Sequence, residues 1–502
     1  MSELPAEGHP SESAPARELH RRARNAIRLL LGRQALLHIL GLGGGIVVAR
    51  ILGPGPLGVF GIALFVITLT GFIADLGMRT ALIQQADSVT EEQLATCFAL
   101  QQAVVTLLVA LLFLTAPAVA SLYYRAPPEL SWLIRLLALD LYFRSWRSMS
   151  EIRLERELRY RELAVADVAG STAYHVVAVG LVIAGWGAQS LAYAILTGNV
   201  LRIALLFRAA PWPVRFSFHL PSVRRLLRRG LVLQAGLVSS QAPRWITPTL
   251  VAGLIGPEAV GLVTWAATLG RKPMDVLENV VRVSLPHFAR LQHDAAEVER
   301  VLMRYALASL LACGLWFAVI AMAGHDLVAL VYTERWLPAM PALIIYAGSA
   351  MIACVRRLAM AALTGVGRIR FAARVGAVAS LISVGSSIVL VLRIGFVGVP
   401  LGQLAGMVIA TPWLLSGLRP GGPGRVIRAA LDGVKPLGAG VVAGGFCLLL
   451  PAATPARGLV AAAVISVVYL ATAWLAGPEW LRAVAREELA LPALGVRGPG
   501  TP

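Results

Sequence analysis

Charged side chains at helical spacing interrupt several long apolar runs of this chain. Asp75 and Arg79 are four residues apart, while Asp140, Arg144 and Arg147 share one face of a helix at i, i+4 and i+7. Ionisable groups inside an apolar segment are costly, so they normally face a water-filled cavity or one another. Arginine binds the oxygens of phosphate or carboxylate through two parallel N–H donors. Arginines among these residues could therefore bind an anion if they face a cavity.

Further charges continue this pattern in the second half of the chain. Arg244 lies near the middle of one apolar run, and Arg356-Arg357 lie in another. A third run carries four charges along one face over three turns: Arg271, Asp275, Glu278 and Arg282. Basic side chains outnumber acidic ones, nine against four, among all candidates for lining a cavity. These candidates are Asp75, Arg79, Asp140, Arg144, Arg147, Arg244, Arg271, Lys272, Asp275, Glu278, Arg282, Arg356 and Arg357.

Two interpretations of these charges remain open. A cationic cavity suits a phosphate or pyrophosphate head group. Acid–base pairs such as Asp75–Arg79 could instead neutralise each other, which helps a helix insert and binds nothing. The stronger candidates for contact with substrate are Arg144, Arg147, Arg244 and Arg271.

The sequence carries no motif of an ATPase or a metalloenzyme. There is no GxxxxGK[ST] phosphate loop, so ATP hydrolysis is not expected. The eight histidines include no HExxH, and the four cysteines fall in or beside apolar runs without metal-ligand spacing. We therefore expect no catalytic residue, no metal and no cofactor, and a protein that is not an enzyme.

Composition places these residues in a membrane protein. The 502-residue chain is 57% hydrophobic and 14% charged, whereas about a quarter of a soluble domain is charged. Apolar runs of twenty or so residues are long enough to cross a bilayer as helices. About fourteen transmembrane helices are predicted in an all-α integral membrane fold. The runs are 29–52, 58–84, 95–120, 129–150, 162–185, 188–208, 229–254, 258–288, 300–330, 338–364, 371–393, 396–417, 435–452 and 457–477.

Two copies of one unit are visible around Gly-Pro turns. Gly53-Pro54 and Gly256-Pro257 stand 203 positions apart, each between two apolar runs. Six spans separate them, and an even number places both turns on one side of the membrane, so the repeat is parallel. Helix breakers recur at corresponding places in both copies, where they predict bending or, alternatively, close helix packing. They are Gly43, Gly44, Gly45, Pro243 and Pro248.

The repeat predicts two six-helix lobes around a central cavity, followed by two further helices. The predicted parts are a basic cytoplasmic tail (1–28), an N-terminal lobe (29–208), a cytoplasmic linker (209–228), a C-terminal lobe (229–417), two extra transmembrane helices (418–477) and a cytoplasmic tail (478–502).

Arginine carries most of the net charge of +18, and its distribution predicts orientation. The connections 150–161 and 208–229 are rich in arginine, while 53–57, 185–188 and 255–257 have no basic residue. Because basic residues gather on the cytoplasmic side of membrane proteins, both termini are expected in the cytoplasm. The charge therefore does not call for a nucleic-acid partner.

Several stretches, in this order, resemble a known group of proteins. They are Ala49–Gly58, Ala74–Gly77, Ala81–Gln84, Thr90–Leu94, Arg153–Arg161, Gly256–Pro286 and Glu334–Ala339. With them the chain resembles the polysaccharide and oligosaccharide flippases of the multidrug/oligosaccharidyl-lipid/polysaccharide exporter superfamily. The nearest branch is that of the O-antigen, teichuronic-acid and exopolysaccharide exporters, and the likeness covers roughly residues 29–417.

The resemblance implies a flippase for an undecaprenyl-pyrophosphate-linked oligosaccharide in a bacterial cytoplasmic membrane, serving export of a cell-surface polysaccharide by alternating access. It implies the lipid-linked oligosaccharide and membrane lipids as partners, with a polysaccharide polymerase as a further candidate. A monomer is expected.

Three alternatives remain. A multidrug antiporter of the same superfamily would favour acids in its cavity, whereas arginine dominates here. A peptidoglycan-precursor flippase would share about fourteen spans and a cationic cavity. A membrane glycosyltransferase or ligase would need a long outward loop with catalytic groups, and no outward connection is long enough.

Overall fold

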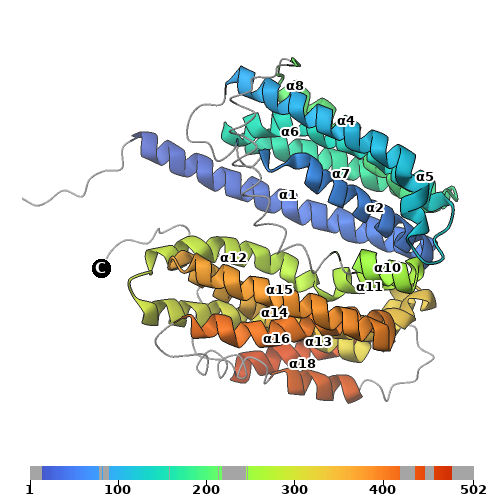
Figure 1. Cartoon of the computed structure of the whole chain (residues 1–502). Coiled ribbons are helices and arrows are strands. Elements are labelled where there is room, and N and C mark those ends of the chain that lie inside the picture. Colours follow the sequence, from blue (N-terminus) through green and yellow to red (C-terminus); the bar gives the residue numbers. More distant parts are fainter. Residues whose placement is uncertain are drawn as a thin grey trace, which may run out of the picture. The chain divides into compact units, whose positions relative to one another are not determined.

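The fold is described by a computed structural model of the chain. It describes residues 14–78, 82, 90–157, 159–212, 214–216, 245, 247–418, 436–446 and 457–476. Within these ranges every regular element is a helix (Figure 1). The predicted all-α fold is therefore confirmed for the described part of the chain.

Seven helices are described before residue 210. They are α1 (Ala14–Leu52), α2 (Pro54–Asp75), α4 (Glu91–Ser121), α5 (Glu129–Ala138), α6 (Asp140–Arg156), α7 (Tyr160–Ile183) and α8 (Gln189–Ala209). The helix α4 begins with a capping box, in which Thr90 and Gln93 exchange backbone-to-side-chain hydrogen bonds at 3.1 and 3.2 Å.

The second half of the chain is equally helical. Its elements are the π-helix η1 (Thr247–Val251), α10 (Ala252–Leu254), α11 (Pro257–Gly270), α12 (Lys272–Arg290), α13 (Ala295–Val331), the 3-10 helix η2 (Glu334–Ala339), α14 (Met340–Gly365), α15 (Ile369–Ile394), the 3-10 helix η3 (Gly395–Val397), α16 (Gly398–Ser416) and α18 (Arg457–Ala476). A short apolar helix also covers Pro436–Phe446.

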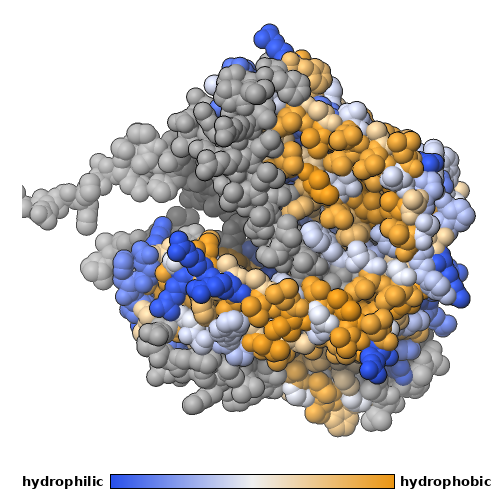
Figure 2. All heavy atoms as spheres, viewed as in Figure 1, coloured by the Kyte–Doolittle hydropathy of each residue, from blue (hydrophilic) through white to orange (hydrophobic). Residues whose placement is uncertain are grey.

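Nine helical segments in the described ranges are long and apolar enough to cross a membrane. Figure 2 shows hydrophobic side chains spread over the visible outer faces of the helices. Leu114 on α4 is 81% exposed and Leu381 on α15 is 72% exposed, which suits contact with lipid rather than water. The chain is thus a multi-pass membrane protein, and the count of fourteen spans stays a prediction.

Two predicted spans each form two helices in the structure. The run 129–150 is divided at Leu139 into α5 and α6, and the run 258–288 is divided at Arg271 into α11 and α12. Around Leu139 the backbone makes i to i+3 hydrogen bonds, to the carbonyl of Leu136 and from the N–H of Tyr142. Both divisions lie at predicted binding residues, since Asp140 directly follows Leu139 and Arg271 is itself such a residue.

The division at Arg271 has a clear chemical cause in Pro273. A proline lacks an N–H and clashes with the carbonyl four residues earlier, which here belongs to Leu269. That carbonyl accepts a hydrogen bond from Nε1 of Trp316 on α13 at 3.2 Å instead. The helix therefore breaks at Arg271 without leaving a buried carbonyl unsatisfied.

Arg153 in the last turn of α6 and Arg159 in the connection to α7 bind carbonyl groups near the end of α8. Nη1 of Arg153 donates to the carbonyl of Pro211 at 2.6 Å, and Nη2 of Arg159 donates to that of Ala209 at 3.0 Å. Cations are favourable at a helix C-terminus, where carbonyls lack helical partners. That Arg153 and Arg159 also fix the orientation of the protein in the membrane stays a prediction.

Contacts divide the chain into two compact units. Unit 1 comprises the described parts of Met1–Leu52, Ala63–Ser121 and Pro127–Ala235, and unit 2 those of Gly53–Ile62, Leu122–Ala126 and Gly236–Pro502. The first turns of α2 thus pack within unit 2, although they belong to the first copy of the repeat. The predicted domain boundaries stay a prediction.

Candidate functional site

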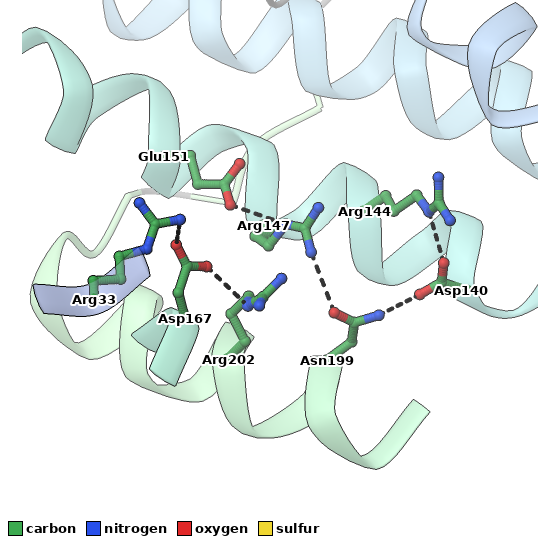
Figure 3. A network of polar contacts seen from close by, with 8 residues as sticks. All are labelled: Arg33, Asp140, Arg144, Arg147, Glu151, Asp167, Asn199 and Arg202. Carbon is green, nitrogen blue, oxygen red and sulfur yellow. Dashed lines mark hydrogen bonds and ion pairs between the residues drawn. The ribbon is translucent and has the colours of Figure 1, made fainter. Parts of the chain in front are cut away.

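Asp140 is the centre of a polar network in unit 1 (Figure 3). Its side chain is 2% exposed and lies at the start of α6. One carboxylate oxygen accepts from Nε of Arg144 at 2.6 Å, and the other accepts from Nδ2 of Asn199 on α8 at 2.5 Å. The Asn199 amide oxygen in turn accepts from Nη1 of Arg147 at 3.2 Å. The predicted trio of α6 therefore forms one connected group through a residue of α8.

A second acid extends this network across α1, α7 and α8. Asp167 of α7 pairs with Arg33 of α1 and, at 3.2 Å, with Arg202 of α8. On α6, Nε of Arg147 lies 2.9 Å from a carboxylate oxygen of Glu151. Figure 3 shows these side chains converging between the helices of unit 1.

Two glycines bring α7 and α8 close enough for these contacts. A Cβ on Gly170 would lie 2.9 Å from the carbonyl oxygen of Gly198, and a Cβ on Gly198 would lie 2.6 Å from that of Gly170. Such distances are too short for a side chain, so glycine on both helices permits this approach. Asp167 precedes Gly170 by one turn, and Asn199 directly follows Gly198.

Charge in this network is nearly balanced. Four arginines (Arg33, Arg144, Arg147, Arg202) face three carboxylates (Asp140, Glu151, Asp167), and each of these arginines lies within 4 Å of a carboxylate. The network therefore nearly balances its charges and joins four helices, although Nε of Arg33, Arg147 and Arg202 has no hydrogen-bond partner among the described residues. Arg144, whose side chain is 36% exposed, is the most accessible of the four arginines.

Arg271 occupies a different setting in unit 2, at the junction of α11 and α12. Its Nη2 donates to the side-chain oxygen of Gln403 on α16 at 2.6 Å. Its guanidinium carbon lies 4.5 Å from the ring centroid of Tyr346 on α14. Both contacts are made with uncharged groups.

The other predicted site residues of unit 2 whose side chains are described form two partly exposed pairs and one incompletely bonded arginine. Nζ of Lys272 lies 3.1 Å from a carboxylate oxygen of Asp275, and Nη1 of Arg357 donates to Glu278 at 2.6 Å. Nε of Arg356 is buried and has no hydrogen-bond partner among the residues that the structure describes. The neighbouring charges that act on Arg356 include those of Arg357 and Arg271. Unit 2 therefore gathers positive charge around Arg356.

Several predicted residues lie outside the described part of the chain. These are Arg79, Arg244, Pro243 and the side chain of Arg282. Asp75 is described as the last residue of α2 and takes part in a polar or electrostatic interaction. The pairing of Asp75 with Arg79 stays a prediction.

The helix-bending candidates have separate surroundings. The helix α1 runs without interruption through Gly43, Gly44 and Gly45, and a Cβ on Gly44 would overlap the imidazole of His175 on α7. Pro248 lies in the π-helix η1, a wider turn that accommodates a proline within a helical segment. Close packing of α1 against His175 therefore explains a glycine at position 44. Bending at these positions stays a prediction.

Sequence reasoning missed seven residues of these contacts: Arg33, Glu151, Asp167, Asn199, Arg202, Gln403 and Tyr346. Asp167 and Arg202 lie inside predicted spans, so the criterion that selected Asp140 would also have found them. Asn199, Gln403 and Tyr346 are uncharged and gave no signal. In the described ranges, no group of three or more His, Cys, Asp or Glu side chains is arranged to hold a metal ion.

Comparisons with known proteins agree on a family of polysaccharide biosynthesis proteins. A family model described as "Polysaccharide biosynthesis protein" matches residues 47–341. The chain is 26% identical over 304 residues to the succinoglycan biosynthesis transport protein ExoT of Rhizobium meliloti (strain 1021), covering 59% of this chain and 60% of that protein. It is also 26% identical over 279 residues to the teichuronic acid biosynthesis protein TuaB of Bacillus subtilis (strain 168), covering 54% and 56%. The chain thus matches less than two thirds of either relative's length.

Solved structures share the fold over nearly the whole chain. The lipid II flippase MurJ in an inward closed conformation superposes with a TM-score of 0.75 and 15% identity, covering 92% of this chain and all of that one. An inward-facing multidrug transporter of the MATE family superposes with a TM-score of 0.58 and 17% identity, covering 82% and 98%. At these identities the likeness concerns the fold alone.

Proposed function

The chain belongs to the polysaccharide biosynthesis protein family, and from this premise we propose that it flips a lipid-linked oligosaccharide across the bacterial cytoplasmic membrane. The substrate proposed is an undecaprenyl-pyrophosphate-linked sugar destined for a cell-surface polysaccharide. A sugar–pyrophosphate head cannot cross hydrocarbon unaided, because burying charges and unpaired hydroxyl groups is very costly. As a transporter, the protein would move this substrate without making or breaking covalent bonds.

The surroundings of two arginines in unit 2 support the choice of an anionic substrate. In unit 2, Arg271 is contacted by an amide and an aromatic ring, and Nε of Arg356 is buried without a hydrogen-bond partner in the described part of the chain. An unsatisfied buried donor is unfavourable unless a ligand completes it. The oxygens of a phosphate or pyrophosphate are suitable acceptors, since they accept several charge-assisted hydrogen bonds at once.

Alternating access is supported by a symmetric contact between two helix starts. A Cβ on Gly58 of α2 would overlap the carbonyl of Pro257 and lie 3.0 Å from the N of Gly261. A Cβ on Gly261 of α11 would overlap the carbonyl of Pro54 and lie 3.1 Å from the N of Gly58. Both pairs of equivalent residues are 203 positions apart, so the two copies of the repeat meet here backbone to backbone. In the proposed cycle these helices separate when the site opens to the outside.

Substitution of one of these glycines tests the proposed cycle. Gly58→Ala would prevent the two helices from closing, and transport should stop although the protein is still made. Gly61→Ala is a matched control, because a Cβ at Gly61 would lie at an ordinary 3.8 Å from Val260. Export of polysaccharide should survive in the control only. Full export with Gly58→Ala would show that closure at this crossing is not required.

The membrane potential assists the proposed direction of transport. With both termini in the cytoplasm, the substrate would move from the cytoplasmic to the outer leaflet. An inside-negative potential favours outward movement of negative charge by about 2.3 kcal/mol per charge per 100 mV. We further propose that the protein acts as a monomer among membrane lipids and delivers its substrate to a polysaccharide polymerase.

The experiment that tests this function uses cells lacking the gene. The leaflet occupied by lipid-linked oligosaccharide is determined by its access to an externally added glycosidase or lectin. The proposal predicts that the intermediate accumulates facing the cytoplasm and that surface polysaccharide disappears. Unchanged lipid-linked sugars and surface polymer would contradict it, and drug efflux and peptidoglycan precursors would then be tested.

A further inference from the structure

The connection between α4 and α5 packs with the second half of the chain. Its residues, Leu122–Ala126, belong to unit 2, although α4 before it and the chain from Pro127 onward belong to unit 1. Two predicted spans separate this connection from the Gly53-Pro54 turn, so both are predicted on the outer side of the membrane. A segment of the first repeat copy is therefore attached to the second copy at that end.

A backbone hydrogen bond makes this attachment. The N–H of Tyr124 donates to the carbonyl of Ala252 on α10 at 3.2 Å. Gly256 lets the two backbones approach, since a Cβ there would lie 3.3 Å from the carbonyl oxygen of Tyr124. Gly256 also has a φ of 114°, a conformation that residues with a side chain rarely adopt. The contact is thus made between backbones, and position 256 suits glycine.

The segment that Tyr124 binds leads directly into the crossing of α2 and α11. Ala252 lies five residues before Pro257, whose carbonyl meets Gly58 at that crossing. Tyr124 and Gly58 come from the first copy of the repeat, whereas Ala252 and Pro257 come from the second. The hydrogen bond therefore joins the two copies at the same end as the crossing does.

The connection itself is a tight turn with one residue in an unfavourable backbone conformation. The N–H of Ala126 donates to the carbonyl of Tyr123 at 3.3 Å, which closes a four-residue turn. Arg125, the third residue of the turn, has a φ of 51°, where glycine or asparagine is normally found. Its guanidinium carbon lies 5.0 Å from the ring centroid of Tyr124. The attached form of the turn is thus strained, and release of the contact would relieve that strain.

Side chains of the turn add little to this attachment. Leu122 is 73% exposed and Tyr124 is 47% exposed, and Arg125 is exposed as well. A backbone hydrogen bond contributes modestly to stability, because water competes for both of its groups. The attachment is therefore weak enough to break and form again.

We propose that the connection 122–126 is a latch, which holds the outer side closed through the hydrogen bond from Tyr124 to Ala252 and is released when the helices at the crossing separate. This inference rests on the proposed function and deepens it, since it adds a second contact that the transport cycle must break. The latch sets how often the outer side opens, and it does so without touching the substrate.

The decisive variant is Tyr124→Pro, which removes the donor N–H. Proline is favoured at the second position of a turn, so the turn itself should persist. Tyr124→Ala is the matched control, because it loses the same side chain but keeps the N–H.

Opening is measured at Val260, which is 1% exposed on α11 and whose Cγ1 would lie 3.8 Å from a Cβ on Gly61 of α2. Separation of α2 and α11 would expose this position. Each variant is combined with Val260→Cys in the full chain, and a membrane-impermeant maleimide is added to right-side-out membrane vesicles. The chain without Val260→Cys gives the background from its own cysteines.

We expect labelling to be about two- to tenfold faster with Tyr124→Pro than with Tyr124→Ala, as loss of one backbone hydrogen bond would allow. Arg125→Gly should have the opposite effect and slow the labelling, because glycine adopts a positive φ without strain and thereby stabilises the attached turn.

Three results would overturn the inference in distinguishable ways. Equal labelling with Tyr124→Pro and Tyr124→Ala, in a chain whose Val260→Cys does react, would show that the latch has no role while the proposed cycle stands. Faster labelling with Arg125→Gly would likewise contradict a latch held by this turn. If Val260→Cys never reacts from outside, the crossing does not open on that side, and the proposed cycle fails together with the latch.

Discussion

Two arginines, Arg147 in unit 1 and Arg271 in unit 2, are both partly buried but make different contacts. Arg147 lies 2.9 Å from the carboxylate of Glu151 and donates to Asn199, which also binds Asp140. Arg271 donates to Gln403 and lies over Tyr346. Arg147 is part of a network of nearly balanced charge, whereas these two contacts of Arg271 are with an amide and an aromatic ring.

This difference separates a structural use of charge from one suited to a ligand. Removing charges from water is costly, and a network that pairs them internally recovers part of that cost as helix-to-helix contacts. Such a network attracts an external anion only weakly, because its potential is nearly cancelled. In unit 2 the charges that act on Arg356 are positive, and its buried Nε has no hydrogen-bond partner among the described residues, so Arg356 is the better candidate for substrate binding.

The largest expected effect is a loss of stability when the charge network of unit 1 is broken. Asp140→Leu removes the acceptor of both Arg144 and Asn199, and loss of one partner of a buried pair typically costs about 3–5 kcal/mol. Thermal unfolding in detergent should show a strongly destabilised protein. Asp275→Leu is the control, since the Lys272–Asp275 pair is partly exposed and should contribute little. Equal stability of the two variants would mean that the network of unit 1 is not structural.

The second effect concerns binding rather than folding. Arg271→Gln removes a fixed cation, and the loss of charge-assisted contacts worth about 1.5–3 kcal/mol corresponds to a roughly ten- to hundredfold weaker binding of farnesyl pyrophosphate. Thermal stability should change little. Arg374→Gln, at an exposed position of α15 in the same unit, should bind normally. Normal binding by Arg271→Gln would remove the proposed distinction between the units.

Substitution of Arg356 is expected to raise the thermal stability of the protein, whereas Asp140→Leu lowers it. The buried Nε of Arg356 lacks a hydrogen-bond partner in the described part of the chain, and such a group costs about 1–3 kcal/mol. Arg356→Met should therefore unfold at a higher temperature than the wild type while binding the pyrophosphate probe less well. A lower unfolding temperature, as expected for Asp140→Leu, would show that Arg356 already has its stabilising partner within the protein.

The smallest effect is expected at the exposed pair beside Arg271. The side chains of Lys272 and Asp275 are 26% and 41% exposed, and such surface pairs contribute about 0–1 kcal/mol. Lys272→Gln should leave unfolding unchanged and reduce binding of the pyrophosphate probe by less than about threefold. If Lys272→Gln weakened binding of this probe as much as Arg271→Gln does, Lys272 would be the main anion contact.

Much of the fold and part of the site could be predicted from the sequence. Long apolar runs gave the all-α membrane fold, and the ordered motifs gave the family, which the match to residues 47–341 confirms. Charges inside these runs led to Asp140, Arg144 and Arg271, because ionisable residues are rare at such positions. The division of the run 258–288 was missed, although Pro273 was a visible signal for it.

The rest depended on which helices become neighbours. Gln403 lies 132 positions from Arg271, and Asn199 lies 52 from Arg147. Both are neutral, so neither their type nor their spacing marked them as partners of an arginine. Periodicity reports the faces of one helix, and contacts between helices are set by packing that one sequence alone does not reveal.

The most direct test of the central claim is transport by the purified protein in sealed lipid vesicles. One vesicle preparation carries an oligosaccharide on a polyprenyl pyrophosphate, and another carries the same oligosaccharide on the neutral polyprenol. Access of added glycosidase reports movement between leaflets. The account predicts rapid transfer of the pyrophosphate-linked sugar alone, and loss of this transfer in Arg271→Gln but not in Arg374→Gln. Equal transfer of both lipids, or unaltered transfer by Arg271→Gln, would contradict recognition of an anionic head group by unit 2.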